Sequence, residues 1–209
     1  MSSLSDAKTL GGIGAILLLV GFPIPYIGFA VSIGGLVLEF IAVKKIADAV
    51  KDKSIFSNFL LNFIFGLIAI SSLIIIMVAT IGSIGGFSFF TTLEGMNTSN
   101  PAEIFSYLQP FLSGCIIAFI IMWILSIIGA IYLKKSYDAI ADHTKVDSFK
   151  TTGLLYVIGT ATFIILIGFL VLFIARIFEI ISYFSLPDTI EQESKENAYS
   201  PNNQSTNFE

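Results

Sequence analysis

The sequence predicts an all-α integral membrane protein with about five transmembrane helices. Of its 209 residues, 55% are hydrophobic and only 12% are charged, whereas soluble domains carry roughly a quarter charged residues. The mean hydropathy is +0.88. The apolar residues form long unbroken runs without the alternation of barrel strands, and a helix pairs every backbone polar group within one segment.

The first two spans are expected to meet at a pair of prolines. The first apolar run, 10–22, reaches the length of a span only when it is counted back to Ser5. Its core also fits a signal peptide, but no small-x-small cleavage site follows, so we expect an uncleaved helix. Pro23 and Pro25 end this helix and start the second span, 26–43.

Three further apolar runs complete the count. They cover residues 56–87, 107–133 and 152–181. Ser54 precedes the first of them and is predicted to be its N-cap. Residues 185–209 are rich in Ser, Asn, Gln and Glu, a composition that buries too little apolar surface to fold. We therefore expect a transmembrane domain over 1–184 and a disordered tail over 185–209.

The lysines predict the orientation. With five spans, nine of the ten lysines fall on one side of the membrane, and the loop 91–103 has no Lys or Arg. Excess Lys and Arg marks the cytoplasmic side. We expect a cell-membrane protein with its N-terminus in the cytoplasm and its C-terminus outside. Two candidate glycosylation sequons, at Asn97 and Asn203, fall on the predicted outside.

The two cytoplasmic connections resemble each other. The pattern Lys-Lys-x-x-Asp-Ala-(Val/Ile)-x-Asp recurs at an offset of 90 residues. The spacing predicts helical extensions, and spans two–three and four–five would form a parallel hairpin repeat. The alternative is that cytoplasmic helix ends commonly use these residue types. Lysines beside an anionic leaflet suit lipid or acidic partners, so the candidate cytoplasmic contact comprises Lys44, Lys45, Asp48, Lys134, Lys135 and Asp138.

Ionisable residues within spans are the default functional candidates. Here they are Glu39, Arg176 and Glu179. Glu39 lies about one helical turn before Lys44 and is expected to snorkel to the inner interface. Arg176 and Glu179 are spaced i,i+3 and predict a local ion pair near the outer surface. A proton or ion relay would need more such groups at mid-depth.

The sequence offers no catalytic or metal-binding set. It contains one histidine and one cysteine, His143 and Cys115, which form neither a metal cluster nor a nucleophile–base pair. No P-loop or His-Glu-x-x-His motif occurs. We therefore expect no enzyme activity and no cofactor. The net charge of −4 argues against nucleic acid, and leaves the lipid bilayer, other membrane proteins or self-association as partners.

Two segments carry a family resemblance. They are KTLGGIGAILL at residues 8–18 and IAVKKIAD at 41–48, the latter followed by DKSIF at 52–56. These segments resemble an archaeal family of uncharacterised multi-pass membrane proteins, domain of unknown function 996. The resemblance covers about residues 4–181 and implies an archaeal plasma membrane. It implies no site residues, because no activity is assigned to the family.

The predicted function is a non-enzymatic one that depends on protein contacts, as a scaffold, assembly factor or accessory subunit. The missing catalytic set and the missing mid-membrane charges favour it. The alternative is a small transporter or channel built on the paired helical hairpins. A membrane enzyme ranks third.

Overall fold

The structure, a computed structural model, describes residues 2–21, 23–86, 88–95 and 101–190. Its helices are α1 (Ser5–Gly21), α2 (Gly28–Val50), α3 (Lys53–Ser83), α4 (Ser88–Gly95), α5 (Pro101–Thr144), α6 (Ser148–Ala161) and α7 (Ile167–Phe184), with a short 3₁₀ turn, η1 (Phe163–Ile165). Two-residue strands, β1 (Ser2–Ser3) and β2 (Thr189–Ile190), pair with each other. The all-α prediction is confirmed.

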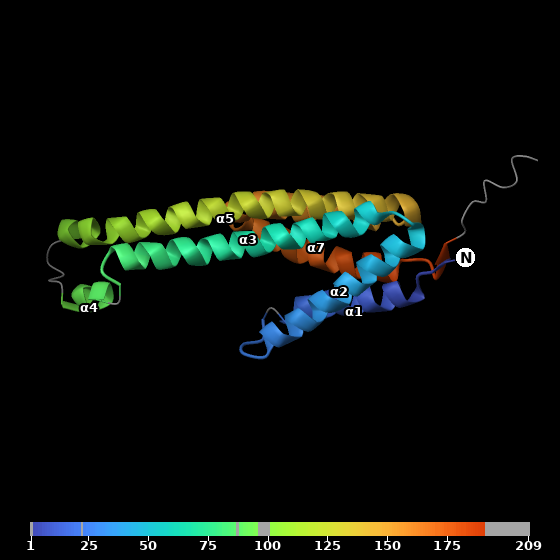
Figure 1. Ribbon diagram of the computed structural model, residues 1–209, viewed down its shortest axis with the longest axis horizontal. Helices are drawn as coiled ribbons and strands as arrows, with labels where there is room; N and C mark the ends of the chain where they lie inside the picture. Colours follow the sequence, from blue (N-terminus) through green and yellow to red (C-terminus); the bar gives the residue numbers. More distant parts are fainter. Residues whose placement is uncertain (1, 22, 87, 96–100, 191–209) are drawn as a thin grey trace, which may run out of the picture.

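Two long helices set the length of the molecule. α3 and α5 lie side by side and antiparallel, and the α1–α2 and α6–α7 hairpins accompany them over only part of their length (Figure 1). The ring of Phe65 on α3 stacks on that of Tyr132 on α5 at 5.6 Å. Farther along, Met77 Sδ lies 3.7 Å from Cys115 Sγ. The long pair is therefore continuous well beyond the shorter hairpins.

The predicted fifth span, 152–181, is wrong as a single helix. It consists of α6 and α7, which run antiparallel, so that Thr152 Oγ1 near one end lies 3.1 Å from Ser182 Oγ near the other. Glycines allow the helices to approach at the turn, because a Cβ on Gly168 would lie 2.2 Å from the Gly159 carbonyl oxygen. α7 therefore returns to the end from which α6 starts.

The tip of the α6–α7 hairpin keeps backbone polar groups paired. The Gly168 N–H donates to the Thr162 carbonyl at 3.2 Å. From α5, Trp123 Nε1 donates to the Thr160 carbonyl at 2.8 Å. An unpaired backbone group costs several kcal/mol in hydrocarbon, so these bonds suit a tip that lies within the membrane.

The α1–α2 hairpin also closes on glycines. A Cβ on Gly35 would lie 2.7 Å from the Gly14 carbonyl oxygen, and one on Gly28 would lie 2.1 Å from the Gly21 carbonyl oxygen. Such contacts require the absence of a side chain, and they hold the two helices together along their length. Pro23 in the connection has no N–H that would need a partner.

The first and last described residues lie together. Ser2 pairs with Ile190 in a short antiparallel ladder, and the Leu4 N–H donates to the Asp188 carbonyl at 2.8 Å. Leu186 is buried. The packed part therefore extends past residue 184 to Ile190, which lies beside Ser2 rather than at the opposite end of the molecule (Figure 1). The rest of the predicted tail, residues 191–209, lies outside the described residues.

Three described helices, α3, α5 and α7, are long and apolar enough to cross a membrane. They make the chain compatible with membrane insertion. The sequence predicted about five spans, but α1 has 17 residues and α6 has 14. At 1.5 Å per residue these two helices are roughly 26 and 21 Å long, shorter than the 30 Å or so of bilayer hydrocarbon.

The N-cap of α3 is Asp52 rather than the predicted Ser54. The Asp52 carboxylate accepts a hydrogen bond from the Ser54 N–H at 2.8 Å and lies 3.1 Å from His143 Nε2 of α5. The hydrogen bond from Ser54, and to a lesser degree His143, holds the pKa of Asp52 below its ordinary value of 3.8. A carboxylate serves the cap better than a hydroxyl here because it also reaches the neighbouring helix.

Replacing Asp52 with alanine will lower the free energy of unfolding by about 1 kcal/mol at neutral pH. Because folding lowers the pKa of Asp52, its contribution is complete above the ordinary value of 3.8 and is lost as the pH falls through the folded value. Asp147, before α6, makes no such side-chain cap, so Asp147→Ala is the control. Denaturation curves at several pH values would contradict this account if both variants lost the same stability.

Candidate functional site

A buried ion cluster joins two hairpins. Arg176 of α7 donates from Nη1 both to Glu39 Oε1 of α2 at 2.9 Å and to Glu179 Oε2 at 2.6 Å. Glu39 is 3% exposed and Glu179 is 1% exposed. Two carboxylates therefore share one guanidinium nitrogen, away from water. The predicted i,i+3 ion pair between Arg176 and Glu179 is present. Arg176 also binds Glu39, which lies 137 positions away in the sequence.

Tyrosines from two further helices complete the ion cluster. Tyr137 of α5 donates to Glu179 Oε1. Tyr156 of α6 donates to Glu179 Oε2 at 2.6 Å, and its ring lies 5.5 Å from the Arg176 guanidinium carbon. Glu179 thus accepts three charge-assisted or phenolic hydrogen bonds, which are the strong kind. The cluster ties α2, α5, α6 and α7 together.

A third tyrosine, Tyr183, is buried beside these groups. Its hydroxyl has no hydrogen-bond partner among the described residues. Its ring packs edge-on against that of Phe149, with the ring centroids 5.3 Å apart. The ring also packs so closely against Gly11 of α1 that a Cβ at that position would overlap it. The ion cluster holds two carboxyl groups and one guanidinium, so it would carry one excess negative charge if both carboxyl groups were ionised. A buried excess charge is unfavourable, so this site suits one additional proton or cation.

The structure corrects the predicted surroundings of the ion cluster. Glu39 does not snorkel, because it is buried against Arg176. Arg176 and Glu179 do not lie at the end remote from the lysines, because Glu179 binds Tyr137, three positions from Lys134. The broken fifth span explains both errors, since α7 runs back to the lysine-rich end. No sequence signal linked the tyrosines to the carboxylates.

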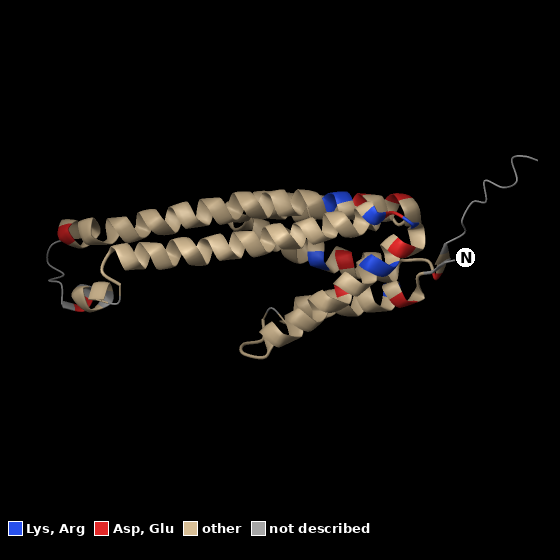
Figure 2. Cartoon of the chain, viewed as in Figure 1, with Lys and Arg blue, Asp and Glu red and all other residues tan. Residues whose placement is uncertain are grey.

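The predicted cytoplasmic contact residues lie at this same end of the molecule (Figure 2). Lys44 Nζ lies 3.5 Å from Asp48, and Lys134 pairs with Asp138, each at i,i+4. Lys45 instead binds Asp6 of α1 at 2.8 Å, and Lys135 lies over the Tyr132 ring. The exposed lysines of these segments and of the adjoining turns lie at the base of both hairpins, and we call this surface the basic end. Its lysines are Lys44, Lys45, Lys51, Lys53, Lys134, Lys135, Lys145 and Lys150.

The helices that follow the two Lys-Lys segments differ. Lys51 and Lys145, which end the α2–α3 and α5–α6 connections, share a left-handed backbone with φ near 60°. Beyond these turns, however, α3 continues for 31 residues while α6 ends after 14. Within the described residues, the likeness is therefore confined to the helix ends and turns.

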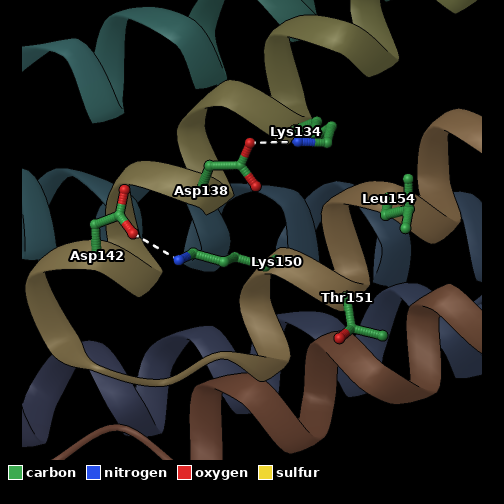
Figure 3. Close-up of a pocket in the computed structure, with 6 residues that line it drawn as sticks. All are labelled: Lys134, Asp138, Asp142, Lys150, Thr151 and Leu154. Atoms are coloured by element: carbon green, nitrogen blue, oxygen red, sulfur yellow. Dashed lines mark hydrogen bonds and ion pairs between the residues drawn. The ribbon is translucent and has the colours of Figure 1, made fainter.

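A shallow pocket of about 410 Å³ opens at the basic end (Figure 3). Its lining residues are Lys134, Asp138, Asp142, Lys150, Thr151 and Leu154. The Lys150 ammonium lies 2.7 Å from Asp142, as the Lys134 ammonium pairs with Asp138. The two positive and two negative groups neutralise each other. Among the described residues, no group of three His, Cys, Asp or Glu could hold a metal ion.

Comparison with known proteins identifies the family. The family model described as "Protein of unknown function (DUF996)" matches residues 31–177. This chain belongs to the DUF996 family. An uncharacterised protein of Methanocaldococcus jannaschii is similar to this DUF996 chain, with 36% identity over 191 residues that cover 91% of this chain and 97% of that protein. No solved structure matches. The resemblance noted in the sequence is confirmed.

The DUF996 match includes part of the ion cluster but assigns it no role. Residues 31–177 begin within α2 and end within α7, so they include Glu39 and Arg176 but stop short of Glu179. The two sequons, at Asn97 and Asn203, lie outside the described residues. The description of the family transfers no chemistry, so a function has to be argued from the geometry.

Proposed function

We propose that this DUF996 protein is a non-enzymatic membrane protein that acts through contacts made at its basic end, as a scaffold, assembly factor or accessory subunit. The observation that carries the proposal is the difference in exposure between two sets of charges. The charges of the ion cluster are mostly buried, whereas at the basic end Lys44 and Lys45 are 61% and 44% exposed in surface ion pairs with Asp48 and Asp6. Exposed lysines suit an acidic protein segment or anionic headgroups.

The pocket at the basic end supports the same proposal. Its ammonium and carboxylate groups are already paired within the chain, so a small charged substrate would have to break these pairs. A protein surface can instead bind across them without separating the ions. Surface pairs of this kind contribute little to stability, about 0–1 kcal/mol each, which leaves them free to rearrange around a partner.

Exchanging the four lysines of the two Lys-Lys segments for glutamine tests the proposal. The substitutions are Lys44→Gln, Lys45→Gln, Lys134→Gln and Lys135→Gln. We expect the protein to insert and fold, and binding of its partner to weaken by at least about tenfold, since each lysine near an anionic surface contributes about 1 kcal/mol. Partners are identified by crosslinking in native membranes and purification in mild detergent, followed by measurement of their affinity.

The control removes lysines at the same end but outside the two segments, as Lys51→Gln, Lys53→Gln and Lys145→Gln together. It should retain the partner. Equal loss in both variants would indicate a nonspecific charge effect. A purified chain that associates only with itself and that carries a solute across liposomes would contradict the proposal.

The alternative function, a small transporter or channel, is favoured by one observation. Two buried carboxyl groups share one guanidinium in the ion cluster, beside the buried Tyr183, and such a site could hold a proton or a cation in transit. Proteoliposomes with a trapped pH dye or a trapped cation indicator separate the two functions. Flux that Glu39→Gln abolishes would support transport, whereas absence of flux favours the scaffold.

We further propose that both ends of the described chain lie on the cytoplasmic side. The pairing of Ser2 with Ile190 brings the two ends together at the basic end, and excess Lys marks the cytoplasm. In a Cys115→Ser background, cysteines at Lys53 and Asp188 should both resist an impermeant maleimide in intact cells. A cysteine at Glu94, at the opposite end, should react. Labelling of the Asp188 position alongside Glu94 would restore the orientation predicted from the sequence.

A further inference from the structure

The two carboxyl groups of the ion cluster have unequal hydrogen-bond partners. Glu179 accepts hydrogen bonds at both of its oxygens, from three donors: Arg176, Tyr137 and Tyr156. Among the described residues, Glu39 accepts a single hydrogen bond, from Arg176 to Oε1. The guanidinium nitrogen lies 2.6 Å from Glu179 but 2.9 Å from Glu39. Hydrogen bonds to the charged form of a carboxyl group favour that form, so the negative charge is better stabilised on Glu179.

The side chain of Glu39 is enclosed by a helix that offers it no charge. Glu39 is 3% exposed. A Cβ at Gly14 of α1 would lie only 3.1 Å from Glu39 Cγ, so α1 packs directly on this side chain with a residue that has neither a charge nor a side-chain donor. A buried charge is tolerated only when it is paired, and the one cation that Glu39 contacts is shared with Glu179.

Three other helices bring titratable groups toward Glu39. They are Tyr137 of α5, Tyr156 of α6, and Arg176, Glu179 and Tyr183 of α7. Phenolic hydroxyls are neutral at neutral pH, so the guanidinium is the one positive charge in this group. The lysines nearest to Glu39 in the sequence, Lys44 and Lys45, bind Asp48 and Asp6 at the surface instead.

We propose that Glu39 is a proton-binding site, which carries its proton while Arg176 and Glu179 form an ion pair beside it. The cluster is then neutral, and no uncompensated charge is buried. A proton adds directly to a carboxyl oxygen, whereas a metal cation would lie beside the guanidinium charge. The proposal does not depend on the contact at the basic end, and holds for a scaffold as well as for a transporter.

The bound proton makes the stability of the fold depend on pH. In the unfolded chain, the Glu39 side chain is in contact with water and ionises above its ordinary value of about 4.3. Unfolding at neutral pH therefore releases one proton, and the equilibrium constant for unfolding rises by about tenfold for each pH unit. The stability that depends on the proton is complete below the ordinary value, and is lost as the pH rises through the value at which Glu39 ionises in the folded protein.

Infrared spectroscopy of the purified full chain tests for the proton directly. In an alkyl maltoside, a detergent without ester groups, we expect the C=O stretching band of a neutral carboxylic acid, above the amide I band. Exposed Asp and Glu do not contribute to it, because they are ionised at neutral pH. The band should disappear in Glu39→Gln. A protein without this band, or a band that Glu39→Gln leaves unchanged, would overturn the proposal.

Tyr137→Phe decides which carboxyl group carries the proton. Tyr137 donates to Glu179 Oε1 and makes no hydrogen bond to Glu39. If Glu39 carries the proton, the band should keep its position in Tyr137→Phe. Loss of a hydrogen bond to the protonated group itself would raise its C=O frequency. A band that moves to higher frequency would therefore assign the proton to Glu179 and overturn the proposal.

Unfolding in mixed detergent–SDS micelles provides a second, independent measurement. Between about pH 6 and 8, the equilibrium constant for unfolding of the unmodified protein should rise, relative to that of Glu39→Gln, by about tenfold per pH unit. Glutamine has the size of a protonated glutamate and no charge, so this variant should fold, and it is the matched control for the titration of every other group, including His143. Parallel pH dependences of the two proteins would contradict a proton on Glu39.

Discussion

Replacing Arg176 with glutamine will destabilise the folded protein by about 3–5 kcal/mol, the loss that follows when one partner of a buried ion pair is removed. Glu39 and Glu179 are 3% and 1% exposed, and without the guanidinium their charges would have no opposite charge nearby. The loss is measured as a shift in the equilibrium unfolding curve of the purified protein in mixed detergent–SDS micelles.

Two further variants show whether the ion cluster is responsible. Lys44→Gln breaks an exposed pair in which the lysine side chain is 61% exposed, and should change stability by less than about 1 kcal/mol. Combining Glu39→Gln, Arg176→Gln and Glu179→Gln removes every charge of the cluster, and should recover most of the stability. If Arg176→Gln unfolds like the unmodified protein, the cluster is not buried as described.

Gly35→Ala will destabilise the protein by about 1–3 kcal/mol, as overpacking of a close contact does. The added Cβ would lie 2.7 Å from the Gly14 carbonyl oxygen and 3.0 Å from the Leu18 nitrogen. Both are backbone atoms, so the contact is relieved only if α1 and α2 separate. The same unfolding measurement detects the loss.

The adjacent Gly34 provides the control. A Cβ there would meet nothing within 4 Å, so Gly34→Ala should be neutral, or stabilising by up to about 1 kcal/mol through its higher helix propensity. Equal effects of the two substitutions would mean that the hairpin does not close on its glycines.

Composition and hydropathy sufficed to predict the class of the protein. Long apolar runs require helices in a bilayer whatever their order, and the all-α prediction is confirmed. The Lys-Lys segments are helical as predicted, because the i,i+4 spacing of Lys44 and Asp48 is a local property. Local signals of this kind remain valid when the tertiary arrangement is unknown.

The broken fifth span could not be found from hydropathy, because the segment is apolar on both sides of the break. Proline marks the first hairpin at Pro23, but no proline or charged residue marks the turn at 162–166, where Thr162 is the one polar residue. Gly159 and Gly168 are the relevant residues. Glycines are so common in membrane helices that these two did not stand out.

The sequence predicted the charged residues of the ion cluster but only one of its two ion pairs. Its three charged residues were identified because charges within spans are rare, and the i,i+3 spacing predicted one of the two ion pairs. The other pair joins residues 137 positions apart, and it depends on the returning α7. Because the fifth span was predicted as one unbroken helix, Arg176 was not expected beside Glu39.

The hydrogen bond from Trp123 to the Thr160 carbonyl, at 2.8 Å, gives the molecule a built-in optical reporter. The chain has one tryptophan, so its ultraviolet emission spectrum has a single indole source. That indole donates to the end of α6, and its emission will change if the α6–α7 hairpin swings away from α5. Intrinsic fluorescence can therefore follow hairpin opening in real time, in detergent or in vesicles, without an attached dye.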